Sequence, residues 1–219
     1  MARQAVIETC LTMTARGLNQ GTAGNVSMRD GDGFLITPSG VPYDGMSPDQ
    51  IVAMDMAGEY RGDWAPSSEW RMHLDIYRAR PEAGAVVHIH STYATALSCL
   101  RVDIPAFHYM IAVAGGVSLR CADYATFGTQ ALSDAMLAAL QDRSACLLAN
   151  HGMICFAPDL PKALALASEV ELLCKQYFIA CQAGEPVILS EAEMGEVMDR
   201  FATYGVQGGK CDDASGGDI

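Results

Sequence analysis

The chain has 219 residues, a length that suits one compact domain and is short for two. Half of its residues are hydrophobic, 18% are charged, and no run of about 18 apolar residues lacks a polar break, so the sequence predicts no membrane-spanning helix. The net charge of -12, with only three lysines among fourteen basic residues, argues against a groove that would follow the phosphates of DNA or RNA.

The N-terminus and the cysteines both favour the cytoplasm. Glu8 stands where a signal peptide would need an apolar stretch. The eight cysteines are scattered without a C-x-x-C pair, and most lie in apolar runs, where a free thiol packs as a small hydrophobic group. Free thiols suit a reducing compartment, so we expect a cytoplasmic protein.

The first half of the chain predicts a helix followed by short strands. Apolar residues recur at helical spacing over residues 2–16, and Gly17 stands where a left-handed cap would end that helix. Strands are expected over residues 25–28, 34–37 and 51–56, the first two joined as a hairpin by a Gly/Asp turn and the third followed by a short return.

The second half alternates helices with buried strands. A helix is expected to begin after Ser67 and Ser68 and to end at Pro81, and Ser190 with Glu193 forms a capping-box pair for a last helix. Between them the patterns predict strands over residues 85–90, 145–149 and 153–156, and helices over 93–100, 129–141 and 161–183.

This order of elements predicts an α/β fold. Because hairpins interrupt the alternation of helices and strands, we expect a single domain with a central mixed, largely antiparallel sheet flanked by helices on both faces, in three layers. The domain is expected to cover residues 1–205. Residues 206–219 are rich in Gly, Asp and Ser and are expected to form a flexible tail.

A histidine pair is the sharpest chemical signal in the chain. His88 and His90 flank Ile89 in a predicted strand, so both imidazoles project from one face. By itself, such a pair indicates two hydrogen-bonded core histidines as readily as it indicates two metal ligands. His151 follows a predicted strand in an Asn-His-Gly turn, and three imidazoles with an open fourth position are the ligand set of catalytic zinc. The remaining histidines, His73 and His108, are expected to be structural.

Glu69 is the candidate carboxylate. It stands at the start of a predicted helix. With a purely local role, it would be an exposed acid whose interaction with the helix dipole stabilises the helix by about 0.3–1 kcal/mol. Beside a metal, the same carboxylate could move a proton on the substrate or serve as a fourth ligand of the substrate-free metal.

Three segments could bind an anion through backbone N–H groups and hydroxyls. They are residues 21–25, the pair Ser39-Gly40 and the pair Ser67-Ser68. Each occurs in many proteins for local reasons of turn or cap formation. Their joint presence in a chain poor in lysine favours a phosphate group.

The order of motifs resembles a known family. The motifs are Gly-Thr-Ala-Gly-Asn-Val-Ser at 21–27, Ile-Thr-Pro-Ser-Gly-Val-Pro-Tyr-Asp at 36–44, Ser-Ser-Glu at 67–69, His-Ile-His at 88–90, His-Tyr-Met-Ile-Ala at 108–112, Tyr-Ala-Thr-Phe-Gly-Thr at 124–129, Asn-His-Gly at 150–152 and Tyr-Gly at 204–205. Over about residues 2–205 the chain resembles the class II L-fuculose-phosphate aldolases of the aldolase/epimerase/adducin-head superfamily.

The resemblance implies a ligand set and a set of substrate contacts. It implies Zn²⁺, with Mn²⁺ or Co²⁺ as substitutes, on His88, His90 and His151, joined by Glu69 when substrate is absent. It implies phosphate binding by Gly24, Asn25, Ser39, Gly40, Ser67 and Ser68. Phe127 and Tyr204 would contact the substrate or close over it. The resemblance further implies a homotetramer with active sites at subunit interfaces, in which Tyr109 reaches a neighbouring subunit's site.

The resemblance also implies a reaction, the reversible cleavage of a ketose 1-phosphate into dihydroxyacetone phosphate and a small aldehyde. Glu69 and Tyr109 would be the catalytic groups, with Tyr109 protonating the departing aldehyde oxygen. Ser39 stands where threonine is usual, and Asn150 and the pair Val206-Gln207 depart from the fuculose enzyme near the sugar end. The substrate could therefore be L-fuculose 1-phosphate, 5-deoxyribulose 1-phosphate or 5-(methylthio)ribulose 1-phosphate.

Other readings stay open. Within the superfamily a pentulose-5-phosphate 4-epimerase or a methylthioribulose-1-phosphate dehydratase would use the same metal site. A non-catalytic alternative is an interaction module that resembles the adducin head. Such a module needs no open metal site, so the presence of His88, His90, His151 and Glu69 argues against it.

Overall fold

The computed structural model describes residues 1–203, with side chains to residue 201. The predicted tail, the boundary at residue 205 and Tyr204 lie outside these residues. Helix α1 (Ala2–Ala15) comes first, and Gly17 after it has a φ of 69°, the left-handed conformation expected of the cap. Within the described part of the chain, no helix has the length and apolar character needed to cross a membrane.

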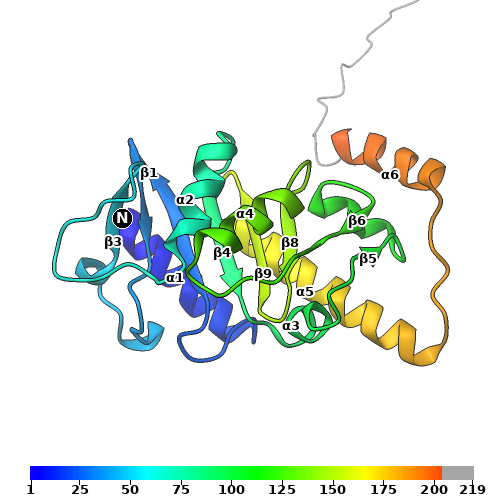
Figure 1. Cartoon of the computed structure of the whole chain (residues 1–219), viewed down its shortest axis with the longest axis horizontal. Coiled ribbons are helices and arrows are strands. Elements are labelled where there is room, and N and C mark those ends of the chain that lie inside the picture. Colours follow the sequence, from blue (N-terminus) through cyan, green and yellow to red (C-terminus); the bar gives the residue numbers. More distant parts are fainter. Residues whose placement is uncertain (204–219) are drawn as a thin grey trace, which may run out of the picture.

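The centre of the fold is a seven-stranded sheet, ordered β3-β2-β1-β4-β9-β8-β7 (Figure 1). Its strands are β1 (Asn25–Asp30), β2 (Gly33–Ile36), β3 (Val52–Asp55), β4 (Ala85–Ile89), β7 (Cys121–Ala122), β8 (Ala145–Leu148) and β9 (Gly152–Ala157). Every neighbouring pair is antiparallel except β7 with β8, which is parallel. The predicted mixed, largely antiparallel sheet is thus confirmed.

Helices cover both faces of the sheet. Val87 and Ile89 of β4 lie in the apolar cluster shared with α1, α3 (Thr92–Ser98) and α5 (Leu160–Ala183). Val86 faces the other way, into the cluster shared with α2 (Trp70–Ala79) and α4 (Gln130–Ala139). Strand alternation therefore places the side chain of His88 on the α2 face, between the sheet and that helix.

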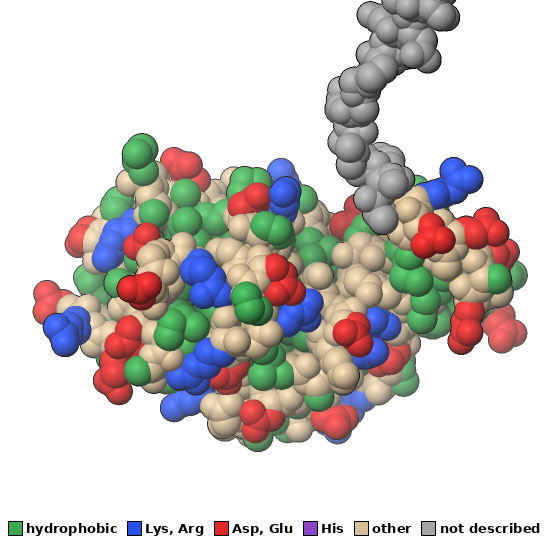
Figure 2. All heavy atoms as spheres, turned by 90° about the horizontal axis from the view of Figure 1, so that it is seen from above, with side chains coloured by type: hydrophobic (Ala, Val, Ile, Leu, Met, Phe, Trp, Pro, Cys, Tyr) green, Lys and Arg blue, Asp and Glu red, His purple; other side chains and the backbone are tan. Residues whose placement is uncertain are grey.

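The shorter elements surround this core. The sequence did not predict the two-stranded sheet of β5 (Ile104–Pro105) and β6 (Ser118–Leu119), strand β7, or the 3-10 helices η1 (Tyr43–Gly45), η2 (Pro48–Gln50) and η3 (Tyr109–Ala114). Helix α6 (Glu191–Thr203) ends the described chain and contacts η3. Figure 2 shows acidic side chains gathered over the α6 end, while acidic and basic side chains are interspersed elsewhere on that face.

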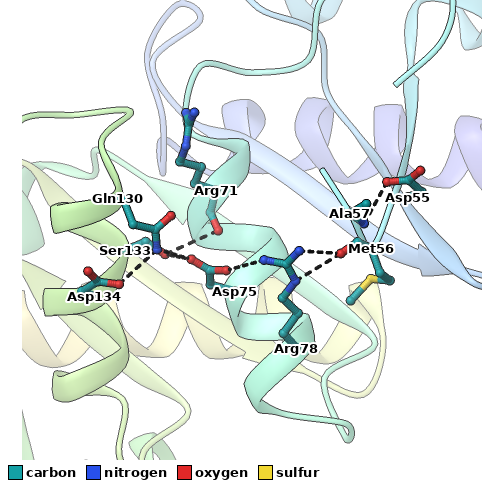
Figure 3. A network of polar contacts seen from close by, with 9 residues as sticks. All are labelled: Asp55, Met56, Ala57, Arg71, Asp75, Arg78, Gln130, Ser133 and Asp134. Carbon is teal, nitrogen blue, oxygen red and sulfur yellow. Dashed lines mark hydrogen bonds and ion pairs between the residues drawn. The ribbon is translucent and has the colours of Figure 1, made fainter. Parts of the chain in front are cut away.

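Helix α2 is held against α4 by a polar network around Asp75 (Figure 3). Oδ2 of Asp75 accepts hydrogen bonds from Gln130 Nε2 and Ser133 Oγ, each at 2.7 Å, and Oδ1 accepts one from Arg78 Nη1 at 3.3 Å. The guanidinium of Arg78 also donates to the carbonyl of Met56, just after β3. These bonds fix the helix that begins next to Glu69.

Candidate active site

Four side chains with metal-ligating atoms converge at the ends of β4 and β8 and the start of α2. They are Glu69, His88, His90 and His151, and one ligand atom from each lies within 4.8 Å of all the others. Nε2 of His88 is 2.9 Å from Nε2 of His90 and 3.1 Å from Oε2 of Glu69, and Nε2 of His151 is 3.0 Å from Oε1 of Glu69. The structure therefore brings together all four predicted ligands.

His88 is oriented by the neighbouring strand. It is fully buried, opposite Ile154 of β9 in the sheet register, and its Nδ1 lies 2.9 Å from the carbonyl oxygen of Met153. A carbonyl only accepts, so Nδ1 carries the hydrogen, and in a neutral ring Nε2 then presents a lone pair to the cluster. An imidazole held in this way through its second nitrogen is typical of metal sites.

His151 reaches the cluster from the turn between β8 and β9. Asn150 has a φ of 53°, a left-handed conformation that asparagine tolerates better than most residues. Its backbone N–H donates to the carbonyl of Ser98 at 3.1 Å, and that of His151 to the Ser98 hydroxyl at 3.3 Å. The end of α3 thus holds the turn in place.

Glu69 is not the exposed acid that a purely local role would require. It is the residue immediately before α2 and is only 6% exposed. Burial raises the pKa of its carboxyl, but the imidazoles of His88 and His151 beside it lower that pKa more, so it lies well below its usual range. The carboxylate is also bound by Asn25 Nδ2 at 2.9 Å.

The cluster suits a cation. Burial and the neighbouring His88 and His151 lower the pKa of His90 to about 4, although Glu69 opposes this, so the ring is neutral near pH 7 and can ligate. Oε1 of Glu69 is buried, and apart from Nε2 of His151 at 3.0 Å it has no polar partner among the described residues. A bound divalent cation would give this oxygen a further partner, and it would separate the imidazole nitrogens of His88 and His90, which now face each other.

The predicted phosphate segments lie side by side next to Glu69. The N–H of Ser39 donates to the carbonyl of Ala65 and that of Ser67 to the carbonyl of Thr37, each at 3.0 Å, so the loops at 37–40 and 65–68 run together. Ser39, Gly40 and Ser68 are exposed, whereas Gly24, Asn25 and Ser67 are buried. Nδ2 of Asn25 carries a second hydrogen besides the one donated to Glu69.

Gly24 could not be any larger residue without a shift of the backbone. A Cβ there would lie 2.7 Å from the carbonyl oxygen of His88 and 3.0 Å from the side-chain amide of Asn19. This close approach of β1 to β4 brings the predicted phosphate loop of residues 21–25 next to the predicted metal ligands.

An open cavity of about 270 Å³ leads to the cluster, and its wall contains Glu69, His90 and His151. The predicted residue Phe127 also lines it, as do Asn150 and Tyr124. Tyr124 was not predicted, although it lies in the same sequence motif as Phe127. Both aromatic side chains are more than half exposed and stand at the mouth of the cavity.

Tyr109 lies elsewhere. It begins η3, is 49% exposed and stacks on Phe201 of α6 with the ring centroids 6.5 Å apart. Together with Met110 and Val197 it lines a different cavity, between η3 and α6. Tyr109 is therefore not part of the cavity that its own chain forms around the histidines.

Fold and site together define a class of protein: a three-layer α/β domain with a candidate three-histidine, one-carboxylate metal centre at one end of its sheet. Residues 4–178 match the model of the class II aldolase and adducin N-terminal domain family. The chain belongs to that family.

Several proteins similar to this chain are named as aldolases. A 5-methylthioribulose-1-phosphate/5-deoxyribulose-1-phosphate aldolase of Rhodospirillum rubrum is 52% identical over 93% of this chain and 92% of its own length. An L-fuculose phosphate aldolase of Escherichia coli strain K12 is 51% identical over 94% of this chain and 96% of its own length. A solved L-fuculose 1-phosphate aldolase structure superposes with a TM-score of 0.89 at 42% identity, covering 92% of this chain and 96% of that one. The chain belongs with these lyases.

Proposed function

We propose that this chain is a zinc-dependent aldolase that reversibly cleaves a ketose 1-phosphate into dihydroxyacetone phosphate and a small aldehyde. The observation that carries the proposal is the cluster of Glu69, His88, His90 and His151, which opens onto a cavity beside the predicted phosphate loops. A carboxylate and a metal site that share one cavity with an anion site are what the cleavage of a phosphorylated ketose requires.

The donor set favours zinc. Three imidazoles and one carboxylate that is free to leave make a site with an open position, which catalytic zinc uses and structural zinc does not. Manganese or cobalt could occupy the same ligands. When bound, the cation would polarise the ketose carbonyl and stabilise the negative charge that develops as the carbon–carbon bond breaks.

The chain's own residues would bind the phosphate and move the protons. The hydroxyls of Ser39, Ser67 and Ser68, the side-chain amide of Asn25 and the backbone N–H groups of Gly24 and Gly40 would hold the phosphate. Glu69 would return a proton to the carbon that becomes part of dihydroxyacetone phosphate, since its carboxylate faces both the metal ligands and the cavity. In cleavage the hydroxyl that becomes the aldehyde carbonyl must lose its proton, so Tyr109 of a neighbouring subunit in a homotetramer would accept that proton, and it would protonate the aldehyde oxygen in the condensation direction.

Three ketose phosphates remain candidates for the substrate. L-fuculose 1-phosphate, 5-deoxyribulose 1-phosphate and 5-(methylthio)ribulose 1-phosphate differ only at the aldehyde end, where Phe127, Asn150 and Tyr124 line the cavity in this chain. Relatives named for each chemistry are similar to this chain to nearly the same degree. A pocket separates a methyl from a methylthio end by only about 1–3 kcal/mol. Tyr204 would close over the substrate.

The test is the release of dihydroxyacetone phosphate by the purified protein from each of the three ketose phosphates, with and without a chelator. We expect release that the chelator abolishes and that added Zn²⁺ restores, and the ratio of the three rates identifies the substrate.

Matched variants test the role of Glu69. Glu69→Gln should lower the rate by about 10²–10⁴-fold, the usual contribution of a positioned acid or base. Glu82→Gln removes an exposed carboxylate that pairs with Arg80 at 2.8 Å, and it should leave the rate unchanged. Zinc bound without release from any substrate would overturn the aldolase proposal in favour of an epimerase or dehydratase. A chain that binds no metal would favour an interaction module.

A further inference from the structure

Five polar side chains form a buried row between β1 and the α2 segment. Glu69, His73 and Tyr77 are spaced four residues apart, so they lie along one face of the helix and the residue that precedes it. Asn25 and Ser27 alternate along β1 and therefore share one face of the strand. The side chains of the helix and the strand meet in alternation, and the row ends at the carboxylate of the metal cluster.

The contacts in the row are short and shielded from water. Nε2 of His73 is 2.6 Å from Oδ1 of Asn25, and Nδ1 of His73 is 2.6 Å from Oγ of Ser27. The hydroxyl of Tyr77 is 2.8 Å from the same Oγ, and Nδ2 of Asn25 is 2.9 Å from Oε2 of Glu69. All five side chains are at most 6% exposed.

The chemistry of the groups gives the row one direction. The ionised carboxylate of Glu69 only accepts hydrogen bonds, so Asn25 must turn its amide nitrogen toward it and its Oδ1 toward His73. His73 must then donate from Nε2, which leaves Nδ1 of the neutral ring to accept from Ser27. The hydrogen of the Ser27 hydroxyl then points to His73, so its oxygen accepts the hydrogen bond from the Tyr77 hydroxyl.

His73 stays neutral in this environment. Burial and the nearby His88 lower its pKa to about 3, although Glu69 opposes the shift. Without the donor at Nε2, the amide of Asn25 could rotate by half a turn and bring its oxygen against the Glu69 carboxylate. Two acceptors would then face each other in a buried site, and the carboxylate would move away.

We propose that His73, held by Ser27 and Tyr77, is a positioning residue that fixes Asn25 with its amide nitrogen toward Glu69 and so aims the carboxylate that moves the proton. The proposal rests on the aldolase function proposed above. It gives a role in the reaction to a histidine that the sequence suggested was only structural.

Two substitutions of His73 test the row directly. His73→Leu fills the space without a donor, and kcat should fall by about 10²-fold, a loss typical of a misplaced catalytic group, while KM changes far less. His73→Gln offers an amide nitrogen near the position of Nε2 and should recover much of that loss. If the histidine only fills space, folded His73→Leu protein with full metal content will have the wild-type kcat, and the proposal is wrong.

A matched pair of serines separates positioning from stability. Ser27→Ala and Ser133→Ala each remove a fully buried hydroxyl that contacts a side chain of α2, but Ser133 bonds Asp75 and lies outside the row. Both substitutions should lower the melting temperature. Only Ser27→Ala should lower kcat, by about tenfold, a tenth of the loss expected for a misplaced catalytic group. Equal kcat values in the two variants would overturn the proposal.

The ring of His73 can be observed without any substrate. In ¹⁵N-histidine-labelled wild-type protein treated with a chelator, NMR should show His73 with its hydrogen on Nε2 and none on Nδ1 between pH 5 and 8. A hydrogen on Nδ1, or a charged ring, would contradict the direction of the row even if a variant fails to fold. If the wild type releases no dihydroxyacetone phosphate, the aldolase proposal fails, and the NMR measurement still decides whether His73 orients Asn25.

Discussion

The two halves of the predicted catalytic machinery lie in different surroundings. The predicted metal half lies within one chain: Glu69 and His88 are at most 6% exposed, His90 and His151 are partly buried, and one ligand atom of each of the four lies within 4.8 Å of the others. Tyr109 is about half exposed, packs against α6 and lines a different cavity. One half is organised by the core of the sheet, whereas the other depends on surface elements.

This difference suggests that one chain can bind the metal alone but needs a second copy for the reaction. A buried cluster held by strand register can bind a metal as soon as the chain folds, because β4, β9 and the start of α2 are already locked together. A half-exposed tyrosine on η3 can act on a substrate at the histidines only if it meets the site of another copy. Metal binding and catalysis should therefore respond differently to substitutions in the two regions.

The largest effect should come from breaking the buried half. His151→Ala removes a ligand that approaches Glu69 Oε1 to 3.0 Å, so we expect loss of bound zinc and a fall in aldolase rate of about three orders of magnitude or more. Metal analysis and release of dihydroxyacetone phosphate would check this. Chelated wild-type protein is the control, since added Zn²⁺ should restore it but not the variant. A variant with full zinc content would exclude His151 as a ligand.

Tyr109→Phe should have the next largest effect. Loss of the hydroxyl should lower kcat by about 10²-fold, at the low end for a group that transfers a proton, and leave the zinc content unchanged. Because Tyr109 is expected to serve a neighbouring subunit's site, co-expression of Tyr109→Phe with Glu69→Gln should restore about a quarter of the wild-type activity in mixed cyclic oligomers. If mixed and separate variants are equally inactive, the tyrosine acts within its own chain or not at all.

The sequence was sufficient to predict which histidines meet in the cluster, because their signals are local. Strand alternation alone predicts that His88 and His90 share a face, and the turn containing His151 lies between two recognisable strands. Glu69 was ambiguous, since its burial depends on where the start of α2 packs. The row through His73 could not be predicted, because it requires the register between β1 and α2, which are separated by about forty residues in the chain. Tyr124 carried no signal apart from its motif.

The charge of the buried half predicts how the metal-free protein responds to acid. The pKa values of His90 and His73 are lowered to about 4 and about 3 in the folded protein, from 6.5. Below pH 6.5 the unfolded chain therefore binds more protons, and the free energy of unfolding should fall as the pH drops from about 6.5 to 4.

Denaturation of chelated protein at several pH values would measure this dependence. Each missing proton contributes a slope of about 1.4 kcal/mol per pH unit, so His90→Gln should reduce the slope between pH 6.5 and pH 4 by up to that amount. Tyr109→Phe is the control from the exposed half and should have the wild-type slope. An unchanged slope in His90→Gln would mean that His90 titrates normally in the folded protein.

The smallest effect should come from the packing between the predicted phosphate loop of residues 21–25 and β4. Gly24→Ala would place a Cβ 2.7 Å from the backbone carbonyl oxygen of His88 and 3.0 Å from the side-chain amide of Asn19, so β1 or β4 would have to shift. We expect the chelated variant to lose about 1–3 kcal/mol of unfolding free energy, the usual cost of overpacking. Gly45→Ala is the matched control: a Cβ there meets nothing within 4 Å, so its stability should stay within about 0.5 kcal/mol of wild type. Equal stability of the two variants would show that β1 can move away from β4 without cost. In that case the pairing of Asn25 with His88 across the sheet would not hold the predicted phosphate loop next to the predicted metal ligands. The hydrogen bonds from Asn25 to Glu69 and His73 would hold it there instead.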